Sequence, residues 1–491
     1  MTDGPSRRRV LEAVGASTLV ALAGCQTDST ERRTTTTPPP TTTPSTRTTT
    51  PPPTTTAVPT TTTAAPPPTP PTTTEPGEGA AARERAARTF LDRLASGAFE
   101  AAAGQFSPDA GVRAETLASL WTSLQRSAGA FVGVEGYQQT TVSGFEAVVV
   151  RARFAGGLQG IRLVFDDRTQ LVGLQFVPVT EREWEPPEYV DSAAFTTTEV
   201  AVDGPGDCTL PGEVTVPAAE GGAGPPFVLL GGSGPTDRDG TLGPNEPDRD
   251  LAYGVASAGR AASLRYDKRT AACRVDPASL TLDDEYTDDA LRAVERLRAV
   301  EGTDPARTVV AGHSLGAYLA PRVARRVDDA AGLLLLAPPG EPVHRLVVEQ
   351  TRYLAALDGA VSAAEQDRID EVAAAAERVE ALDIEAGETV LGAGRPYWEQ
   401  LLAYDPVEAT LAADVPVFVA FGGRDYQVDA DDREVWTEGL AGVERATVRT
   451  YEDLNHLFAP GSGPGRPSEY AEANHVAARV VDDVGAWIAA R

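Results

Sequence analysis

The chain has 491 residues, of which 71 are acidic and 43 are lysine or arginine, so its formal net charge is −28. This length exceeds one ordinary hydrophobic core, and two or more domains are expected. The acidic excess excludes the basic face that phosphate binding requires, so we expect no nucleic-acid partner. It is typical of proteins kept soluble in concentrated salt and favours a halophilic, archaeal source. Lys268 is the only lysine.

Residues 1–25 have the features of a cleavable export signal. Arginines at Arg7, Arg8 and Arg9 precede an apolar run over residues 11–24, which is shorter than the about 20 apolar residues of a permanent membrane span. This order predicts a signal of the twin-arginine kind. The run ends in Leu-Ala-Gly-Cys, which resembles a lipobox, so we expect Cys25 to be lipidated and to anchor the chain to the outer face of the cell membrane. The alternative is an ordinary signal in which this cysteine has no role.

Residues 26–78 are almost entirely threonine and proline. This segment lacks the apolar side chains that would offset the entropy of ordering, so it cannot build a core. Proline-rich chain favours an extended conformation of about 3.1 Å per residue, which predicts a disordered stalk between the anchor and the folded part. Thr/Pro stalks outside cells are commonly O-glycosylated, and this composition fits.

Two of the three cysteines, Cys208 and Cys273, remain once the first is assigned to the anchor. An extracytoplasmic compartment permits disulfides, so these two form either a bridge or two buried thiols. The sequence has no Cys-x-x-Cys pair and no Cys/His cluster, and we expect no metal.

Residues 79–180 predict a small α+β domain. Apolar residues recur at helical spacing over residues 83–95 and again between residues 117 and 124. Three segments dense in valine and phenylalanine predict strands over residues 145–154, 160–166 and 171–177. Two helices followed by a curled antiparallel sheet resemble a small accessory domain of cystatin- or NTF2-like shape. The segment has no histidine, no cysteine and no carboxylate pair at a useful spacing, so we expect a packing or positioning domain.

From residue 195 to residue 491, short apolar strands alternate with helical stretches. The predicted strands cover residues 214–216, 227–230, 261–265, 308–311, 333–336, 417–421 and 447–451. Such alternation favours an α/β fold with a mostly parallel sheet covered on both faces, whose active site lies at the carboxyl ends of the strands. A long helical insertion over about residues 338–405 is expected to form a lid.

Gly-His-Ser-Leu-Gly at residues 312–316 follows a predicted strand and opens a helix rich in alanine and leucine. A nucleophile elbow needs this strand–turn–helix order because its serine has a strained backbone. Flanking glycines avoid collisions with neighbouring backbone, and the helix N-terminus points amide N–H groups toward developing negative charge. These features predict Ser314 as a nucleophile. The alternative is a serine that simply caps a helix.

The base must come from four histidines. His313 adjoins the nucleophile and cannot swing onto it, and His344 lies in the predicted lid. His475 is expected on the surface of the final helix. His456 lies just past the strand 447–451, at the active-site end of the sheet, and is the predicted base.

The strand 417–421 runs into Gly-Gly-Arg-Asp, which presents Asp425 beyond its carboxyl end. This carboxylate would hold His456 in the productive tautomer and stabilise the imidazolium. Glu452 and Asp453 are competitors because they are near the histidine in sequence, but on the same loop we expect them to be solvated.

Two backbone amides are expected to form an oxyanion hole. One belongs to Leu315, which follows the nucleophile. The strand 227–230 leads into Gly-Gly-Ser-Gly-Pro at residues 231–235, where the amide of Ser233 is the expected second donor. The alternative is a glycine turn that binds nothing.

Four stretches carry a specific resemblance: LLGGSGPTDRDGTLGPNEPDRDLAYGVASAGRAASLRYDKRT at 229–270, AGHSLGAYLAPR at 311–322, FGGRDYQV at 421–428 and LNHLF at 454–458. They resemble α/β-hydrolases that pair this catalytic domain with a small N-terminal domain. The resemblance extends from about residue 81 to residue 491. It implies Ser314, Asp425 and His456 as the triad, with Ser233 and Leu315 as oxyanion donors.

The resemblance also has one departure. Gly231 stands where members of the family usually have a histidine that supports the loop. Asp239, Asp267 and Arg269 fall in matched stretches, and we expect them to brace the loop. In these hydrolases an insertion between late strands forms the lid. Its candidate pocket residues are Tyr353, Leu354, Tyr397 and Trp398, which could equally pack the lid onto the sheet.

The resemblance implies a serine hydrolase that forms an acyl-enzyme, without metal or organic cofactor, and that acts on small-molecule esters. A serine peptidase or amidase shares this chemistry and stays open. A surface lipoprotein that binds ligands with an inactive hydrolase fold is the alternative from another class.

Overall fold

The computed structural model describes residues 78–142, 145–155, 157–177, 184–218, 224–301, 303 and 306–491. The predicted export signal, the lipidated Cys25 and the stalk up to residue 77 lie outside the described residues. Within the described ranges, no helix combines the length and the apolar character that crossing a membrane requires.

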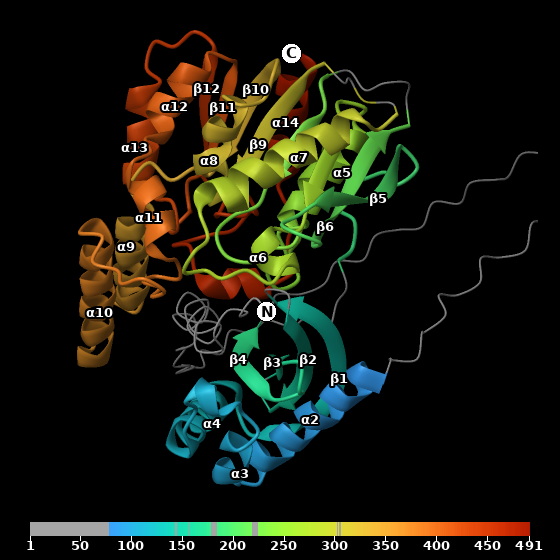
Figure 1. Cartoon of the computed structure of the whole chain (residues 1–491). Helices are drawn as coiled ribbons and strands as arrows, with labels where there is room; N and C mark the ends of the chain where they lie inside the picture. The colour runs from blue at the N-terminus through green and yellow to red at the C-terminus, as the bar shows by residue number, and fades with distance from the viewer. Residues whose placement is uncertain are drawn as a thin grey trace, which may run out of the picture.

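The first folded unit packs helices against one face of a meander sheet (Figure 1). Its helices are α2 (Glu78–Ala95), α3 (Phe99–Ala103) and α4 (Ala114–Ala128). Its strands, all paired antiparallel in chain order, are β1 (Phe131–Val142), β2 (Phe145–Phe154), β3 (Gly157–Phe165) and β4 (Leu171–Val177). Alternate residues of β2, such as Val148 and Val150, pack with Phe90, Leu91 and Trp121 of the helices, as the two-residue period of a strand dictates.

The sequence did not predict β1. Its segment contains Gly133 and Gly136, and each lies at a register shift in the pairing with β2. Its side chains are mostly half-buried or exposed, so the strand lacks the dense apolar pattern of its neighbours. This segment is a strand because it pairs with β2, and not because its own composition favours one.

The second unit is built on a sheet of order β12-β11-β10-β9-β7-β8-β6-β5. Its pairs are parallel from β12 to β8, and β8–β6 and β6–β5 are antiparallel. The strands are β5 (Phe195–Asp203), β6 (Thr209–Pro217), β7 (Phe227–Leu230), β8 (Ser263–Tyr266), β9 (Thr308–His313), β10 (Ala330–Leu336), β11 (Val417–Gly422) and β12 (Ala446–Tyr451). The sheet is mostly parallel, as the alternation predicted, and its architecture is the α/β-hydrolase fold that the resemblance implied.

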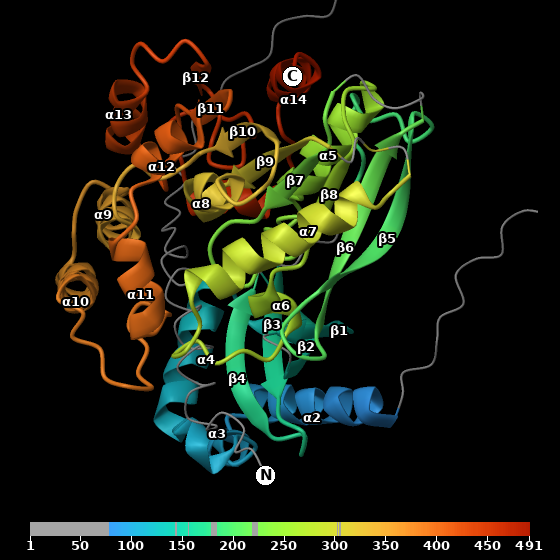
Figure 2. The same cartoon turned by 45° about the horizontal axis from the view of Figure 1, so that its top comes forward.

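Helices cover both faces of this sheet (Figure 2). One face packs against α7 (Asp289–Arg298) and α8 (Leu315–Ala324), and the other against α5 (Pro247–Ser257) and α14 (Ala478–Ala489). Successive residues of β7 point to opposite faces of the sheet. Val228 packs in the hydrophobic core beneath α7 and α8, and Leu229 packs in the core beneath α5 and α14. The strands are therefore apolar on both sides, which explains their continuous hydrophobic runs.

Further helices lie in the segments that connect β8 to β12 along the chain. The insertion after β10 contains α9 (Val343–Ala356), α10 (Ala363–Glu380) and α11 (Arg395–Leu402). The others are α6 (Arg269–Ala272), a π-helical turn (Asp283–Asp288), α12 (Pro406–Ala413) and α13 (Ala430–Gly439).

A disulfide joins Cys208, between β5 and β6, to Cys273 at the end of α6, with the Cα atoms 6.0 Å apart. Of the two alternatives that the sequence left open, the structure therefore has the disulfide and not two free thiols. Beside it, the Arg274 guanidinium lies 2.9 Å from the Asp167 carboxylate and 4.7 Å from the ring centre of Phe145. These contacts join the small domain to the segment after β8, and both views place the small sheet beside α6 (Figures 1 and 2).

Candidate active site

Ser314 lies at a sharp turn between β9 and α8. Its φ is 55° and its ψ is −124°, a backbone conformation that residues other than glycine rarely adopt. Such a conformation persists only where the surrounding structure enforces it. Its N–H donates to the carbonyl of Leu336 on β10 at 2.8 Å. A Cβ on Gly316 would lie 2.2 Å from the carbonyl oxygen of Leu230, so this position requires glycine. The strand, turn and helix therefore have the geometry of a nucleophile elbow.

Asp425 and His456 are hydrogen-bonded to each other. The distance from His456 Nδ1 to Asp425 Oδ2 is 2.6 Å, and both residues are buried. The other carboxylate oxygen, Oδ1, accepts the N–H groups of Gln427 and Val428 at 2.7 and 3.0 Å. Because a carboxylate accepts and does not donate, Nδ1 carries a proton, which leaves Nε2 of the neutral ring as the basic nitrogen.

The loop that carries His456 is held by two neighbours. The side-chain oxygen of Asn455 accepts the N–H groups of Leu457 and Ala459 at 3.0 and 3.1 Å. His313 Nε2 donates to the carbonyl of His456 at 2.9 Å, and the two ring centres are 4.7 Å apart. Burial lowers the pKa of His313 to about 3, so its ring is neutral. Sequence reasoning excluded His313 as a base and missed its contact with the His456 backbone, whose only signal was its place beside Ser314.

The competing residues are engaged elsewhere. Glu452 and Asp453 are exposed, and Asp453 pairs with Arg479. His344 is buried in α9 with its ring centre 6.3 Å from that of Trp398.

The prediction that His475 lies on the surface of the final helix was wrong. This residue precedes the final helix, which begins at Ala478, and the N–H of the next residue, Val476, donates to the Asp250 carboxylate of α5 at 3.0 Å. There the ring nitrogen Nδ1 lies 3.1 Å from the Asp250 carboxylate.

The loop after β7 packs against Ser314. A Cβ on Gly232 would lie 3.4 Å from the Cβ of Ser314, so the Ser233 peptide begins beside the elbow. The amide of Leu315 is the first of α8. A Cβ on Gly231 would lie 2.7 Å from Thr236 Oγ1, so the space beside this glycine is already filled.

Of the three residues expected to brace this loop, Asp239 and Asp267 hold the segment that continues from it, whereas Arg269 pairs outside it. Asp239 pairs with Arg249 at 2.6 Å and with buried Arg265. The Asp267 carboxylate accepts the N–H of Arg238 at 2.9 Å. The Arg269 guanidinium donates to buried Asp289 at 2.6 and 2.7 Å, which anchors α6 to α7.

Sequence reasoning assigned no role to Lys268. Its Nζ lies 2.9 Å from the carbonyl oxygens of both Gly232 and Gly234 and 2.7 Å from the hydroxyl of Tyr286. The signal that could have found it is its being the only lysine in the chain.

The four lid candidates occupy two different settings. The Tyr353 ring stacks on that of Tyr426, with centres 5.4 Å apart, and Leu354 is half-buried. The side chains of Tyr397 and Trp398 are buried in the core. Tyr397 donates to Glu285 at 3.2 Å and Trp398 donates to the Val390 carbonyl at 2.8 Å. The packing alternative therefore describes these last two better than a pocket role does.

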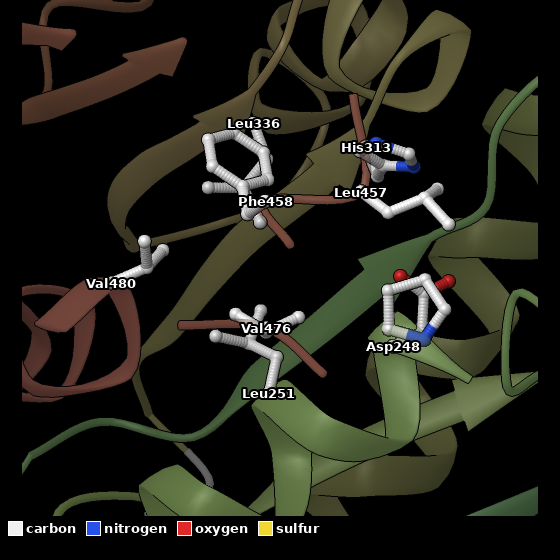
Figure 3. Close-up of a pocket in the computed structure, with 9 residues that line it drawn as sticks. Asp248, Leu251, His313, Leu336, Leu457, Phe458, Val476 and Val480 are labelled. Carbon is white, nitrogen blue, oxygen red and sulfur yellow. The ribbon is translucent and has the colours of Figure 1, made fainter. Parts of the chain in front are cut away.

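A small cavity lies behind the elbow, on the α5–α14 side of the sheet (Figure 3). The His313 ring and the Asp248 carboxylate face it from one side, and Phe458 and Val480 from the other. Burial raises the pKa of Asp248 to about 7.

Comparisons with known proteins agree with this architecture. Residues 247–473 match the alpha/beta hydrolase family, and residues 87–174 match a protein family of unknown function, DUF3887. Esterase EstD of Thermotoga maritima is 36% identical over 401 residues, which cover 81% of this chain and 93% of that protein.

Solved structures resemble the chain at lower identity. The Pyrococcus furiosus esterase Pf2001 has a TM-score of 0.37 at 17% identity, covering 63% of this chain and 99% of that one. The hyperthermophilic esterase of Pyrobaculum calidifontis has a TM-score of 0.39 at 18% identity, covering 60% and 85%. The identity to the Thermotoga esterase over nearly its whole length shows the family: this chain belongs to the alpha/beta hydrolase family.

Proposed function

We propose that this chain is a serine esterase that acts outside the cytoplasm through an acyl-enzyme on Ser314. The observation that carries the proposal is the buried 2.6 Å hydrogen bond between Asp425 and His456. Such a pair is what an imidazole base needs to activate a serine. The Thermotoga relative is named an esterase, and this similarity supports an ester as the substrate.

In the proposed reaction, Ser314 Oγ attacks the carbonyl carbon of the ester while His456 Nε2 accepts the hydroxyl proton. Asp425 stabilises the resulting imidazolium through Nδ1–H. The negative charge that develops on the carbonyl oxygen is received by the N–H groups of Ser233 and Leu315. The imidazolium then gives its proton to the departing alcohol. In the second half of the reaction, water attacks the acyl carbon while His456 Nε2 accepts its proton. The imidazolium returns that proton to Ser314 Oγ, and the acid is released.

A fluorophosphonate probe in concentrated salt tests this proposal. We expect it to label the wild type and not Ser314→Ala. The matched control is Ser257→Ala, because Ser257 ends α5 and contacts the Asp191 backbone. This control should be labelled as strongly as the wild type. A folded wild type without labelling would favour the inactive ligand-binding alternative.

The choice between ester and amide needs a matched pair of substrates. We expect p-nitrophenyl acetate to be hydrolysed with a much higher kcat/KM than p-nitroacetanilide. A preference for the anilide would instead support the serine peptidase or amidase.

The location is proposed from the sequence. We propose that Cys25 is lipidated after export and that the Thr/Pro stalk holds the enzyme off the outer membrane face. Cys25→Ala is then expected to move the protein from the membrane fraction to the medium. Retention in the membrane fraction would refute the anchor.

The acidic composition supports a halophilic source. Because salt screens repulsion within a chain of charge −28, we expect higher resistance to unfolding in molar KCl than in dilute buffer. Greatest stability in dilute buffer would contradict this part of the proposal.

A further inference from the structure

The carbonyl oxygen of Gly232 receives two buried donors. Lys268 Nζ and the Tyr286 hydroxyl each lie 2.9 Å from it. The ammonium group also donates to the Gly234 carbonyl at 2.9 Å and to the Tyr286 hydroxyl at 2.7 Å, so all three of its hydrogens are used. The two side chains are 3% and 1% exposed, so water does not compete for these bonds.

The Gly232 carbonyl and the Ser233 N–H belong to one peptide unit. In a trans peptide the C=O and N–H bonds point in opposite directions. With its oxygen directed at Lys268 and Tyr286, this peptide directs its N–H away from them. The backbone at this point packs against Ser314, since a Cβ on Gly232 would lie 3.4 Å from that of the serine.

We infer that Lys268 is a positioning residue that, together with Tyr286, orients and polarises the Gly232–Ser233 peptide, so that the Ser233 N–H is a stronger oxyanion donor. The inference rests on the proposed function. A cation on the carbonyl oxygen draws electron density along the peptide. Hydrogen bonds linked in this way strengthen one another by roughly 10–30% each. The positive charge also lies near the place where the negative charge of the transition state develops.

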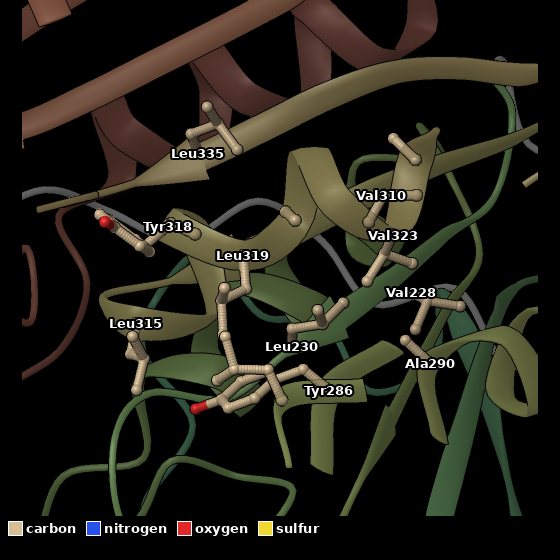
Figure 4. Packing of buried hydrophobic residues seen from close by; sticks show 14 of the residues in the cluster. Val228, Leu230, Tyr286, Ala290, Val310, Leu315, Tyr318, Leu319, Val323 and Leu335 are labelled. Carbon is tan, nitrogen blue, oxygen red and sulfur yellow. The ribbon is translucent and has the colours of Figure 1, made fainter. Parts of the chain in front are cut away.

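The surroundings keep the ammonium group in this place. Glu285 supplies a counter-charge 3.2 Å from Nζ and is itself bonded to Thr270 at 2.7 Å. Burial lowers the pKa of Lys268, while Glu285 and Asp289 oppose that shift. The Tyr286 ring packs in the apolar core and its hydroxyl points out of the cluster (Figure 4).

The same contacts account for the glycine at position 231. The stem of Lys268 lies 3.7 Å from the place that a Cβ on Gly231 would take, and Thr236 Oγ1 lies at 2.7 Å. The lysine stem and the threonine therefore fill the space beside the loop. The support that a histidine would give from within the loop comes here from α6 and the π-helical turn.

The test compares the wild type with Lys268→Met and Tyr286→Phe. The matched control is Arg274→Met, because Arg274 is a cation six residues further on that contacts the small domain instead. We would measure kcat and KM for p-nitrophenyl acetate, and the affinity for a trifluoromethyl ketone, which forms a tetrahedral adduct with an oxyanion. For Lys268→Met we expect kcat to fall roughly 10- to 100-fold, below the about 10²–10³-fold loss for removing a direct oxyanion donor.

The result that identifies positioning is a loss of ketone affinity by the same factor as kcat, with KM within about twofold of the wild type, because the effect acts on the transition state. Tyr286→Phe should give a smaller loss of the same kind, and Arg274→Met none. A Lys268→Met enzyme that keeps kcat, or that loses kcat without losing ketone affinity, overturns the inference.

If Lys268→Met does not fold, Tyr286→Phe decides, and unchanged kcat and ketone affinity in that variant overturn the inference. An inactive wild type overturns the proposed function together with this inference. An active wild type with unaffected variants overturns the inference alone.

Discussion

The Cys208–Cys273 disulfide has an effect on stability that follows from its position in the chain. It joins residues separated by 65 positions. Closing a loop of this length removes conformational entropy from the unfolded chain, worth about 4 kcal/mol at 25 °C. The double variant Cys208→Ser, Cys273→Ser is therefore expected to unfold with a free energy about 4 kcal/mol lower than the wild type.

The measurement is unfolding by guanidinium chloride in concentrated salt, followed by circular dichroism, with Cys25→Ser as the common background so that no free thiol reshuffles the bridge. The wild type with a reductant should match the double variant, because both lack the same cross-link. A loss below about 1 kcal/mol would refute the loop-closure reasoning. A much larger loss in the serine variant than in the reduced wild type would assign the effect to the buried Cys273 site instead.

Three further changes probe the proposed catalytic pair of Asp425 and His456, the buried acid Asp248 and the turn at Ser314. Asp425→Asn should lower kcat for p-nitrophenyl acetate about 10⁴-fold with little change in KM, because the amide leaves His456 in the wrong tautomer. In the folded state Asp248 has a pKa raised to about 7, so it binds more protons than the unfolded chain and stability falls as pH rises toward 7. Asp248→Asn lacks this loss, and its gain in unfolding free energy over the wild type should grow by about 2–3 kcal/mol from pH 5 to pH 8 in guanidinium titrations. Gly316→Ala places a Cβ 2.2 Å from the Leu230 carbonyl oxygen and should abolish fluorophosphonate labelling and lower the denaturation midpoint.

For each of these three predictions, one result would contradict it. A kcat that falls less than tenfold in Asp425→Asn would contradict the proposed catalytic role of this residue. An advantage of Asp248→Asn that does not change with pH would refute the shifted pKa. The control for the elbow is Gly133→Ala, whose Cβ meets no atom within 4 Å. A Gly316→Ala chain as stable and as reactive as this control would show that the elbow accommodates a methyl group.

The α/β-hydrolase domain was predictable because its sequence signals are local. A strand buried on both faces must be apolar at every position, so the predicted strand 308–311 lies within β9 and 417–421 within β11. Glycines around Ser314 and before Asp425 mark sharp turns, and such turns follow strands at the active-site edge. The order of the motifs along the chain then narrowed the choice of base to His456.

The missed features depend on partners distant in sequence. β1 forms on β2 although its own pattern is weak, and His475 takes its place from Asp250, 225 residues away. The buried setting of Tyr397 comes from Glu285, 112 residues earlier in the chain. A sequence pattern indicates which face of a strand or helix is buried, but it does not identify the residues that pack against that face.

The sequence alone determined the fold class and the residues expected to carry the chemistry, because hydrophobic period, glycine position and motif order are properties of short segments. Only the tertiary structure decided that Cys208 bonds to Cys273, that Asp425 holds His456 and that Lys268 meets the Gly232 carbonyl. Each of these contacts joins segments through the folding of the sheet, and its geometry is fixed by packing across the whole domain.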